Sequence, residues 1–139
     1  MPTVQKTIRI HEKTITEIEQ IARESDREFS VIANELLDEA VRMQRCPGII
    51  FSEGTTGRRA RIADTGIEVW EVIAAYKSVG EHFDSLRQAY HWLTEHQLMA
   101  AVGYYSLYPE DIDNLIKHNE KITKKHAHKK YPFLARGSR

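Results

Sequence analysis

The fold depends first on a short alternating stretch near the N-terminus, Val4-Gln5-Lys6-Thr7-Ile8-Arg9-Ile10. Successive side chains of a β-strand point to opposite faces. Gln5, Thr7 and Arg9 therefore fall on one face, and the other face is apolar except for Lys6. The alternation predicts a strand with one polar and one mostly apolar side.

Two helical patterns follow this strand within the first 45 residues. The first pattern predicts a helix over about residues 13–24, with an apolar stripe of Ile15, Ile18, Ile21 and Ala22. A polar turn is expected at residues 25–28, and Ser30 is expected to be the N-cap of the second helix. The second apolar stripe consists of Ile32, Leu36, Leu37, Ala40 and Val41. Pro47-Gly48 is expected to end this helix.

One strand and two helices cannot enclose a core. A lone strand also leaves its backbone N–H and C=O groups without ladder partners. A second copy of the chain supplies the missing strand, because two copies can pair their strands antiparallel and cover one side of the ribbon with four helices. The pattern therefore predicts a homodimer or a higher oligomer.

Residues 3–45 resemble a ribbon-helix-helix domain of the Arc/MetJ/CopG type. The residues that carry the resemblance are Gln5-Lys6-Thr7-Ile8-Arg9-Ile10 and Ser30-Val31-Ile32-Ala33-Asn34-Glu35-Leu36-Leu37. The resemblance implies an intermolecular two-stranded antiparallel ribbon in which Gln5, Thr7 and Arg9 read DNA bases. It also implies that Ser30 and Val31 hold a phosphate at the start of the second helix.

The chemistry of these side chains suits the DNA major groove, which admits a two-stranded ribbon. Arg9 can donate two hydrogen bonds to guanine, Gln5 can pair with adenine, and Thr7 can contact a thymine methyl group. The N–H groups at a helix start favour a phosphate. Dimer symmetry predicts double-stranded DNA with a palindromic or repeated operator. The alternative is a solvated sheet face, which is the usual meaning of such alternation.

Residues 46–116 predict a second compact domain that is mainly helical. Strands are expected at residues 49–51 and 58–62 around a turn at 54–57. Helices are expected at 67–77 and 83–91, the latter with Asp84 or Ser85 near its cap. Thr94 and Gln97 predict a capping box that opens a third helix, and Pro109 is expected to start a last one.

About residues 48–116 resemble the domain-of-unknown-function family 433. The matching pieces are Arg61-Ile62-Ala63-Asp64-Thr65-Gly66-Ile67-Glu68-Val69-Trp70, Leu86 to Tyr90, Leu93-Thr94 to Ala101 and Tyr108-Pro109-Glu110-Asp111-Ile112-Asp113. The resemblance implies a helix-turn-helix-like fold with a β-hairpin. It also implies a similarity to VapB-like antitoxins, whose partners are PIN-type ribonucleases.

Two pairs of residues in this second domain each allow two interpretations of their role. Arg59 and Arg61 share a strand face and form a second candidate DNA contact, or they solubilise a hairpin edge. Trp70 and Trp92 are candidate partner anchors, but their helical apolar neighbours favour two core aromatics.

Charge divides the chain unevenly, although its net charge is zero. Residues 1–116 contain 12 Lys and Arg against 19 Asp and Glu, whereas residues 117–139 contain 8 against 1. A neutral total therefore does not exclude nucleic acid as a partner. The basic tail, residues 117–139, is expected to be partly helical or disordered.

Several function classes find little support in the sequence. No apolar run reaches the roughly 20 residues of a membrane helix, and no signal peptide is recognisable. The single Cys46 favours a cytoplasmic setting. Histidines at 91, 96, 118, 126 and 128 lack partners at metal-ligand spacing. We expect no metal, no cofactor and no enzymatic activity, since no phosphate loop or nucleophile elbow occurs.

Three functions remain from these observations. The first is a DNA-binding antitoxin that represses its own transcription and neutralises a toxin ribonuclease. The second is a stand-alone dimeric transcriptional regulator without a toxin. The third is an assembly module whose strand only dimerises.

Overall fold

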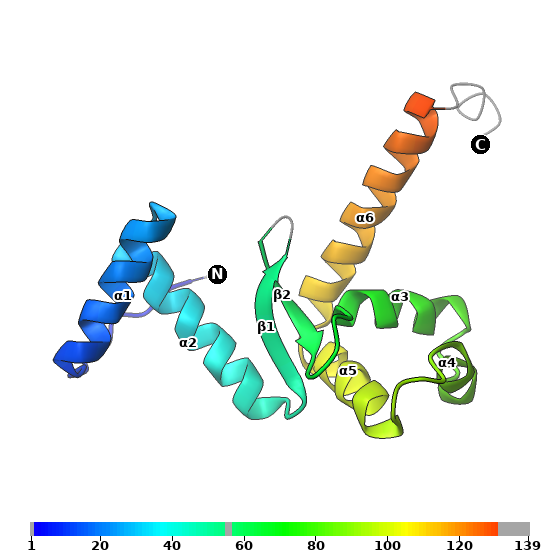
Figure 1. The fold of residues 1–139 in the computed structure, drawn as a ribbon, viewed down its shortest axis with the longest axis horizontal. Coiled ribbons are helices and arrows are strands. Elements are labelled where there is room, and N and C mark those ends of the chain that lie inside the picture. The colour runs from blue at the N-terminus through cyan, green and yellow to red at the C-terminus, as the bar shows by residue number, and fades with distance from the viewer. Residues whose placement is uncertain (1, 55–56, 131–139) are drawn as a thin grey trace. The chain divides into compact units, whose positions relative to one another are not determined.

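The computed structural model describes residues 2–54 and 57–130, and the surroundings of side chains as far as Lys125. The described residues form six helices and one two-stranded antiparallel sheet, so the predicted class, mainly α with short β, is confirmed (Figure 1). The contacts divide the chain into two units, Met1–Arg42 and Met43–Arg139. The following paragraphs describe each unit by itself.

The N-terminal unit contains the two predicted helices, α1 (Glu12–Ser25) and most of α2 (Phe29–Arg45). The polar turn between them forms as predicted. Asp26 adopts the left-handed conformation, with φ of 51°, which a short polar side chain tolerates. The amide N of Arg27 donates to the carbonyl O of Ala22 at 3.0 Å, and this bond closes the end of α1.

Two predictions in this unit are not confirmed. Residues 2–11 have no regular secondary structure, so the expected strand over residues 4–10 is not formed within one chain. A β-ladder needs a partner strand, and the first strand along the described chain begins only at Ile49. The N-cap prediction for Ser30 is wrong, because α2 begins at Phe29 and places Ser30 inside the first turn.

The C-terminal unit begins with a β-hairpin. Strand β1 (Ile49–Gly54) pairs antiparallel with β2 (Gly57–Ile62), and Ile49 lies opposite Ile62. Gly48 makes the turn from α2 into β1 with φ of 93°, a conformation that favours glycine. A Cβ at this position would lie 3.2 Å from the Cβ of Ala100, so the turn also passes close to another part of the unit.

Four helices complete this unit. They are α3 (Val69–Ser78), α4 (Phe83–Ala89), α5 (Glu95–Leu107) and α6 (Pro109–Lys130). The predicted capping box is confirmed: Gln97 N donates to Thr94 Oγ1 at 3.1 Å, and Thr94 N donates to Gln97 Oε1 at 2.8 Å. The N-cap residue of α4 is His82, and Asp84 and Ser85 lie near this cap, in the first turn, as predicted.

One hydrophobic core holds the hairpin and these helices together. Its fully buried large side chains come from β2, α3, α4, α5 and α6, and they are Ile62, Val69, Val72, Ile73, Leu86, Leu98, Tyr104 and Ile112. Cys46, which follows α2 directly, is buried in the same core as a free thiol. The core therefore fixes the starts of α3 and α6 against the hairpin.

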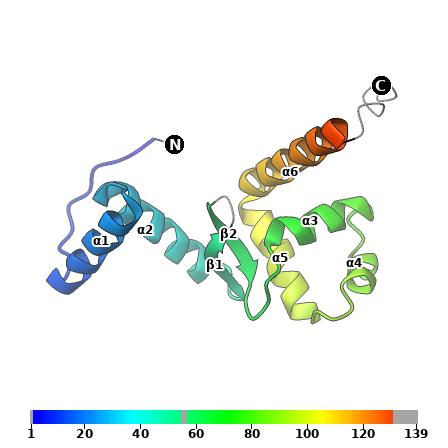
Figure 2. The same cartoon turned by 45° about the horizontal axis from the view of Figure 1, so that its top comes forward.

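Helix α6 continues well past the core that it joins. Its first turns pack against α3 and α5, and its second half projects away from them, as two views show (Figure 1, Figure 2). The basic tail is thus helical as far as Lys130. Among the described residues no helix has the length and apolar character to span a membrane.

Candidate functional sites

The predicted base-reading side chains belong to the irregular N-terminal segment, residues 2–11. Gln5, Thr7 and Arg9 are all exposed in the single chain. The apolar residues that alternate with them are exposed too, with Val4 at 91% and Ile8 at 59%. Exposed apolar side chains at alternating positions are a surface that a partner strand with covering helices would bury.

The predicted phosphate-holding residues lie at the start of α2. The bond from Ile32 N to Glu28 O, 3.1 Å long, spans the first turn of this helix. The amide groups of Ser30 and Val31 precede that bond, as amides of a first helical turn do. Both residues are exposed. Although the predicted N-cap lies two residues too far along the chain, both amides are at the positive end of the helix.

The helices of the N-terminal unit bury few of their apolar side chains. Among described residues 2–42, the buried apolar residues are Ala22 and Ile32. Ile15 and Ile18 are half-buried. The exposed large apolar residues of α1 and α2 in this unit are Ile21, Phe29, Val31, Leu36, Leu37 and Val41. The apolar stripes that predicted these helices are thus mostly uncovered in one chain.

Arg59 and Arg61 are half-buried on β2, and both contact their own unit. Arg61 Nη1 donates to the carbonyl O of Gly66 at 2.8 Å. Arg59 Nη1 donates to the carbonyl O of Arg58 at 3.1 Å, and Arg59 Nε lies 3.5 Å from Glu68 Oε1. These contacts connect the hairpin to the turn before α3. Both interpretations of these two arginines, a second DNA contact and a solubilising hairpin edge, stay predictions.

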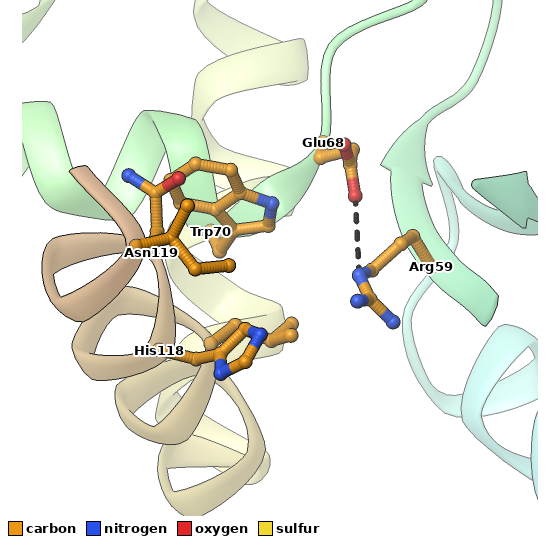
Figure 3. A pocket seen from close by; sticks show the side chains of 7 residues that line it. Arg59, Glu68, Trp70, His118 and Asn119 are labelled. Atoms are coloured by element: carbon orange, nitrogen blue, oxygen red, sulfur yellow. Dashed lines mark ion pairs between the residues drawn. The ribbon is translucent and has the colours of Figure 1, made fainter. Parts of the chain in front are cut away.

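A groove of about 230 Å³ lies between the hairpin side of this unit and α6. Its lining residues are Arg59, Glu68, Trp70, Leu115, His118, Asn119 and Ile122. Figure 3 shows the Arg59–Glu68 pair on one side, and His118 and Asn119 on the other. Trp70, Leu115 and Ile122 supply the apolar part. The groove therefore combines a paired charge with an aromatic wall and an aliphatic wall.

The two tryptophans differ, although core positions were predicted for both. Trp70 is half-buried, packs against the core and lines the groove. The core prediction is wrong for Trp92, whose surface is 60% exposed. Its ring lies 5.3 Å from that of Tyr90 and 5.1 Å from that of His91. Trp92 precedes Thr94, the N-cap residue of α5, and belongs to the turn between two helices.

A contact between three helices was not predicted from the sequence. Lys77 Nζ on α3 and the hydroxyl of Tyr105 on α5 both donate to Asp113 Oδ1 on α6, at 2.9 and 2.8 Å. These hydrogen bonds lower the pKa of Asp113. Hydrogen bonding with Tyr105 and Asp113 raises the pKa of Lys77. No local pattern connects residues that are 36 positions apart.

The histidines form no metal cluster with Cys, Asp or Glu in the part of the chain that the structure describes. His118 lines the groove, and His91 contacts Trp92. The side chains of His126 and His128 lie outside the described residues. The predicted absence of a cofactor and of enzymatic chemistry stays a prediction.

Comparison with known proteins identifies part of the second unit. The family model described as "Protein of unknown function (DUF433)" matches residues 49–105, from β1 into α5. The crystal structure of a DUF433 member protein from Anabaena variabilis ATCC 29413 is 31% identical in sequence. That comparison covers 78% of this chain and 99% of that one, with a TM-score of 0.42. None of the curated proteins matches this sequence.

The family match has clear limits along the chain. It includes Arg59, Glu68 and Trp70, and it leaves out the N-terminal unit and the α6 wall of the groove. The predicted resemblance to family 433 is confirmed over residues 49–105. The ribbon-helix-helix and VapB-like resemblances stay predictions.

Proposed function

The chain belongs to the DUF433 family, and from the unit that precedes its family domain we propose that it is a DNA-binding antitoxin. In this proposal, two copies form a ribbon that binds an operator and represses the chain's own transcription. The second unit neutralises a PIN-type ribonuclease.

One observation carries the proposal: α1 and α2 are amphipathic helices whose apolar faces are largely uncovered. Leu37 is 59% exposed and Val41 is 54% exposed, one turn apart on α2. Exposing several large apolar side chains costs free energy, since burying each one contributes about 1.5–3 kcal/mol. A second copy of the unit would cover these faces, and it would also supply a ladder for residues 4–10.

The proposed DNA contact follows from this pairing. Once two segments pair antiparallel, Gln5, Thr7 and Arg9 of both copies would lie on one face of the ribbon. The first-turn amides of the exposed residues Ser30 and Val31 would then hold phosphates on either side of the groove. The first 45 residues contain 7 basic and 9 acidic residues, so base contacts matter more here than general attraction to DNA.

The proposed toxin contact belongs to the second unit. This unit has its own core, so it can serve a partner without disturbing the ribbon. The projecting part of α6 presents exposed Lys117, Lys121, Lys124 and Lys125. PIN-type ribonucleases, the partners that the VapB-like resemblance implies, use acidic side chains, and a basic helix complements an acidic surface.

A pull-down of the tagged full-length chain from cells that carry its gene natively tests this proposal. The eluate is divided and analysed for protein and for DNA. We expect one small ribonuclease, active alone and inactive in the complex, together with enriched DNA from the chain's own promoter. An Arg9→Ala chain should keep the ribonuclease and lose the promoter enrichment.

The other results distinguish the remaining functions. Promoter DNA without a ribonuclease would favour a stand-alone dimeric regulator. A dimer that enriches neither promoter DNA nor a ribonuclease would contradict both DNA-binding functions and leave the assembly module.

A further inference from the structure

The groove beside α6 has the features of a binding pocket for one side chain of a partner protein. Its apolar part is accessible, because Ile122 is 40% exposed and Trp70 is only half-buried. Leu115 lies two helical turns before Ile122 and lines the same groove. A volume of about 230 Å³ accommodates one large apolar side chain. Such pockets, filled by one anchor residue, dominate the energetics of protein interfaces.

The charged residues within the groove argue against a phosphate as its occupant. Arg59 Nε lies 3.5 Å from Glu68 Oε1, so the carboxylate opposes any anion that approaches the guanidinium group. The Glu68 Oε1 atom is buried and has no hydrogen-bond donor among the described residues. An apolar side chain therefore suits the groove better than a phosphate does.

The charges around the groove indicate the charge of the partner surface that carries this side chain. The exposed residues of α6 between 117 and 125 include four lysines and one glutamate. A partner that inserts an apolar side chain beside Ile122 would bring its own surface against this basic helix. Charge complementarity at the rim of an interface selects a partner of opposite charge.

From these observations we propose that the groove of Trp70, Leu115 and Ile122 receives an apolar side chain from an acidic protein surface. The inference rests on the proposed function, in which that surface belongs to the ribonuclease. Helix α6 then guides the encounter by its charge, and the groove holds the complex together.

Isothermal titration of the full-length chain with the ribonuclease recovered in the pull-down tests this inference. Ile122→Glu places a charge in the groove and should weaken binding, raising the dissociation constant about tenfold or more. Met99→Glu is the matched control, because Met99 is an exposed apolar residue of α5 and is 54% exposed. The control should bind as tightly as the natural chain does.

Two further measurements test the groove without placing a charge in it. A photo-crosslinker at position 122 should link the full-length chain to the ribonuclease, at a site flanked by acidic residues. Fluorescence of Trp70, isolated in a Trp92→Phe chain, should change when the ribonuclease is added.

The outcomes separate this inference from the proposed function. If Ile122→Glu binds and inhibits the ribonuclease normally, the groove proposal is wrong and the antitoxin function stands. Crosslinks that reach only DNA or a second copy of the chain would also overturn it. If no ribonuclease binds the full-length chain at all, both proposals fail together.

Discussion

Lys77 on α3 and Asp113 on α6 form an ion pair with Nζ and Oδ1 2.9 Å apart, and the hydroxyl of Tyr105 on α5 donates to the same oxygen. The ammonium group also lies 5.1 Å from the centre of the Tyr105 ring. This contact links the three helices that support the groove wall.

The first prediction concerns this contact. Both side chains are about two-fifths exposed, so water screens the pair, and Asp113→Asn should reduce the free energy of unfolding by about 0.2–1 kcal/mol at pH 7. Hydrogen bonds from Lys77 and Tyr105 lower the pKa of Asp113 below its ordinary 3.8. The contribution is therefore complete above pH 3.8 and disappears as the pH falls through the lowered pKa.

Urea unfolding of the natural chain and of Asp113→Asn, at pH 7 and near pH 2, checks the direction of this pH dependence. The difference between the natural chain and Asp113→Asn should shrink in acid as the natural carboxyl group takes up a proton. Because the pKa of Lys77 is raised, the stabilisation by this pair should also be lost at high pH, but only as the pH rises beyond 10.5. A difference that grows as the pH falls would contradict this explanation.

The second prediction concerns Gly48. Its φ of 93° opposes a side chain, and so does the 3.2 Å that would separate an added Cβ from the Cβ of Ala100. Gly48→Ala should therefore destabilise the chain by about 1 kcal/mol or more, measured by thermal or urea unfolding. Gly103→Ala is the control, because a Cβ at this helical position meets nothing within 4 Å. That change should be neutral or should stabilise by up to about 1 kcal/mol.

The third prediction concerns the uncovered face of α2. Leu37→Glu should convert the dimer into a monomer, because Leu37 is 59% exposed in one chain and buried in the proposed dimer. Sedimentation equilibrium measures the change. Met99→Glu, the same kind of substitution on α5, should leave the dimer intact. A Leu37→Glu chain that remains a dimer would place the interface elsewhere.

The fourth prediction concerns how Arg9 reads DNA. Arg9→Ala should weaken operator binding by about 1–3 kcal/mol and relax specificity at one base pair. Arg9→Lys should recover little of this loss, since lysine keeps the charge but not the two-point geometry. Gel-shift titration against the operator and a single-base variant measures both effects. Full recovery by lysine would mean that Arg9 contacts only phosphate.

Local patterns predicted most of the helices and the hairpin. The stripe from Ile15 to Ala22 marks α1 because it depends only on neighbours along the chain. The Thr94–Gln97 capping box is equally local, and it forms as predicted. The N-cap of α2 was misplaced by two residues, because Ser30 is a good cap by type but the helix begins at Phe29.

Features that depend on distant residues could not be predicted in this way. Trp92 follows a helical stripe, yet it lies in a turn that leaves it exposed. The groove needs α6 to lie beside Trp70, and about 50 residues separate Glu68 from Asn119. The spacing of Leu115 and Ile122 was the one available signal that α6 continues as an amphipathic helix. The proposed ribbon needs a second chain, and the position of that chain cannot be predicted from one sequence.

Amide hydrogen exchange at residues 4–10, measured above and below the dimer's dissociation concentration, tests the central claim most directly. If two copies share a ribbon, alternate amides of this segment should be protected in the dimer and should exchange freely in Leu37→Glu. Rapid exchange at every concentration in a chain that is dimeric would show that no ribbon forms, and the proposed DNA contact would be wrong.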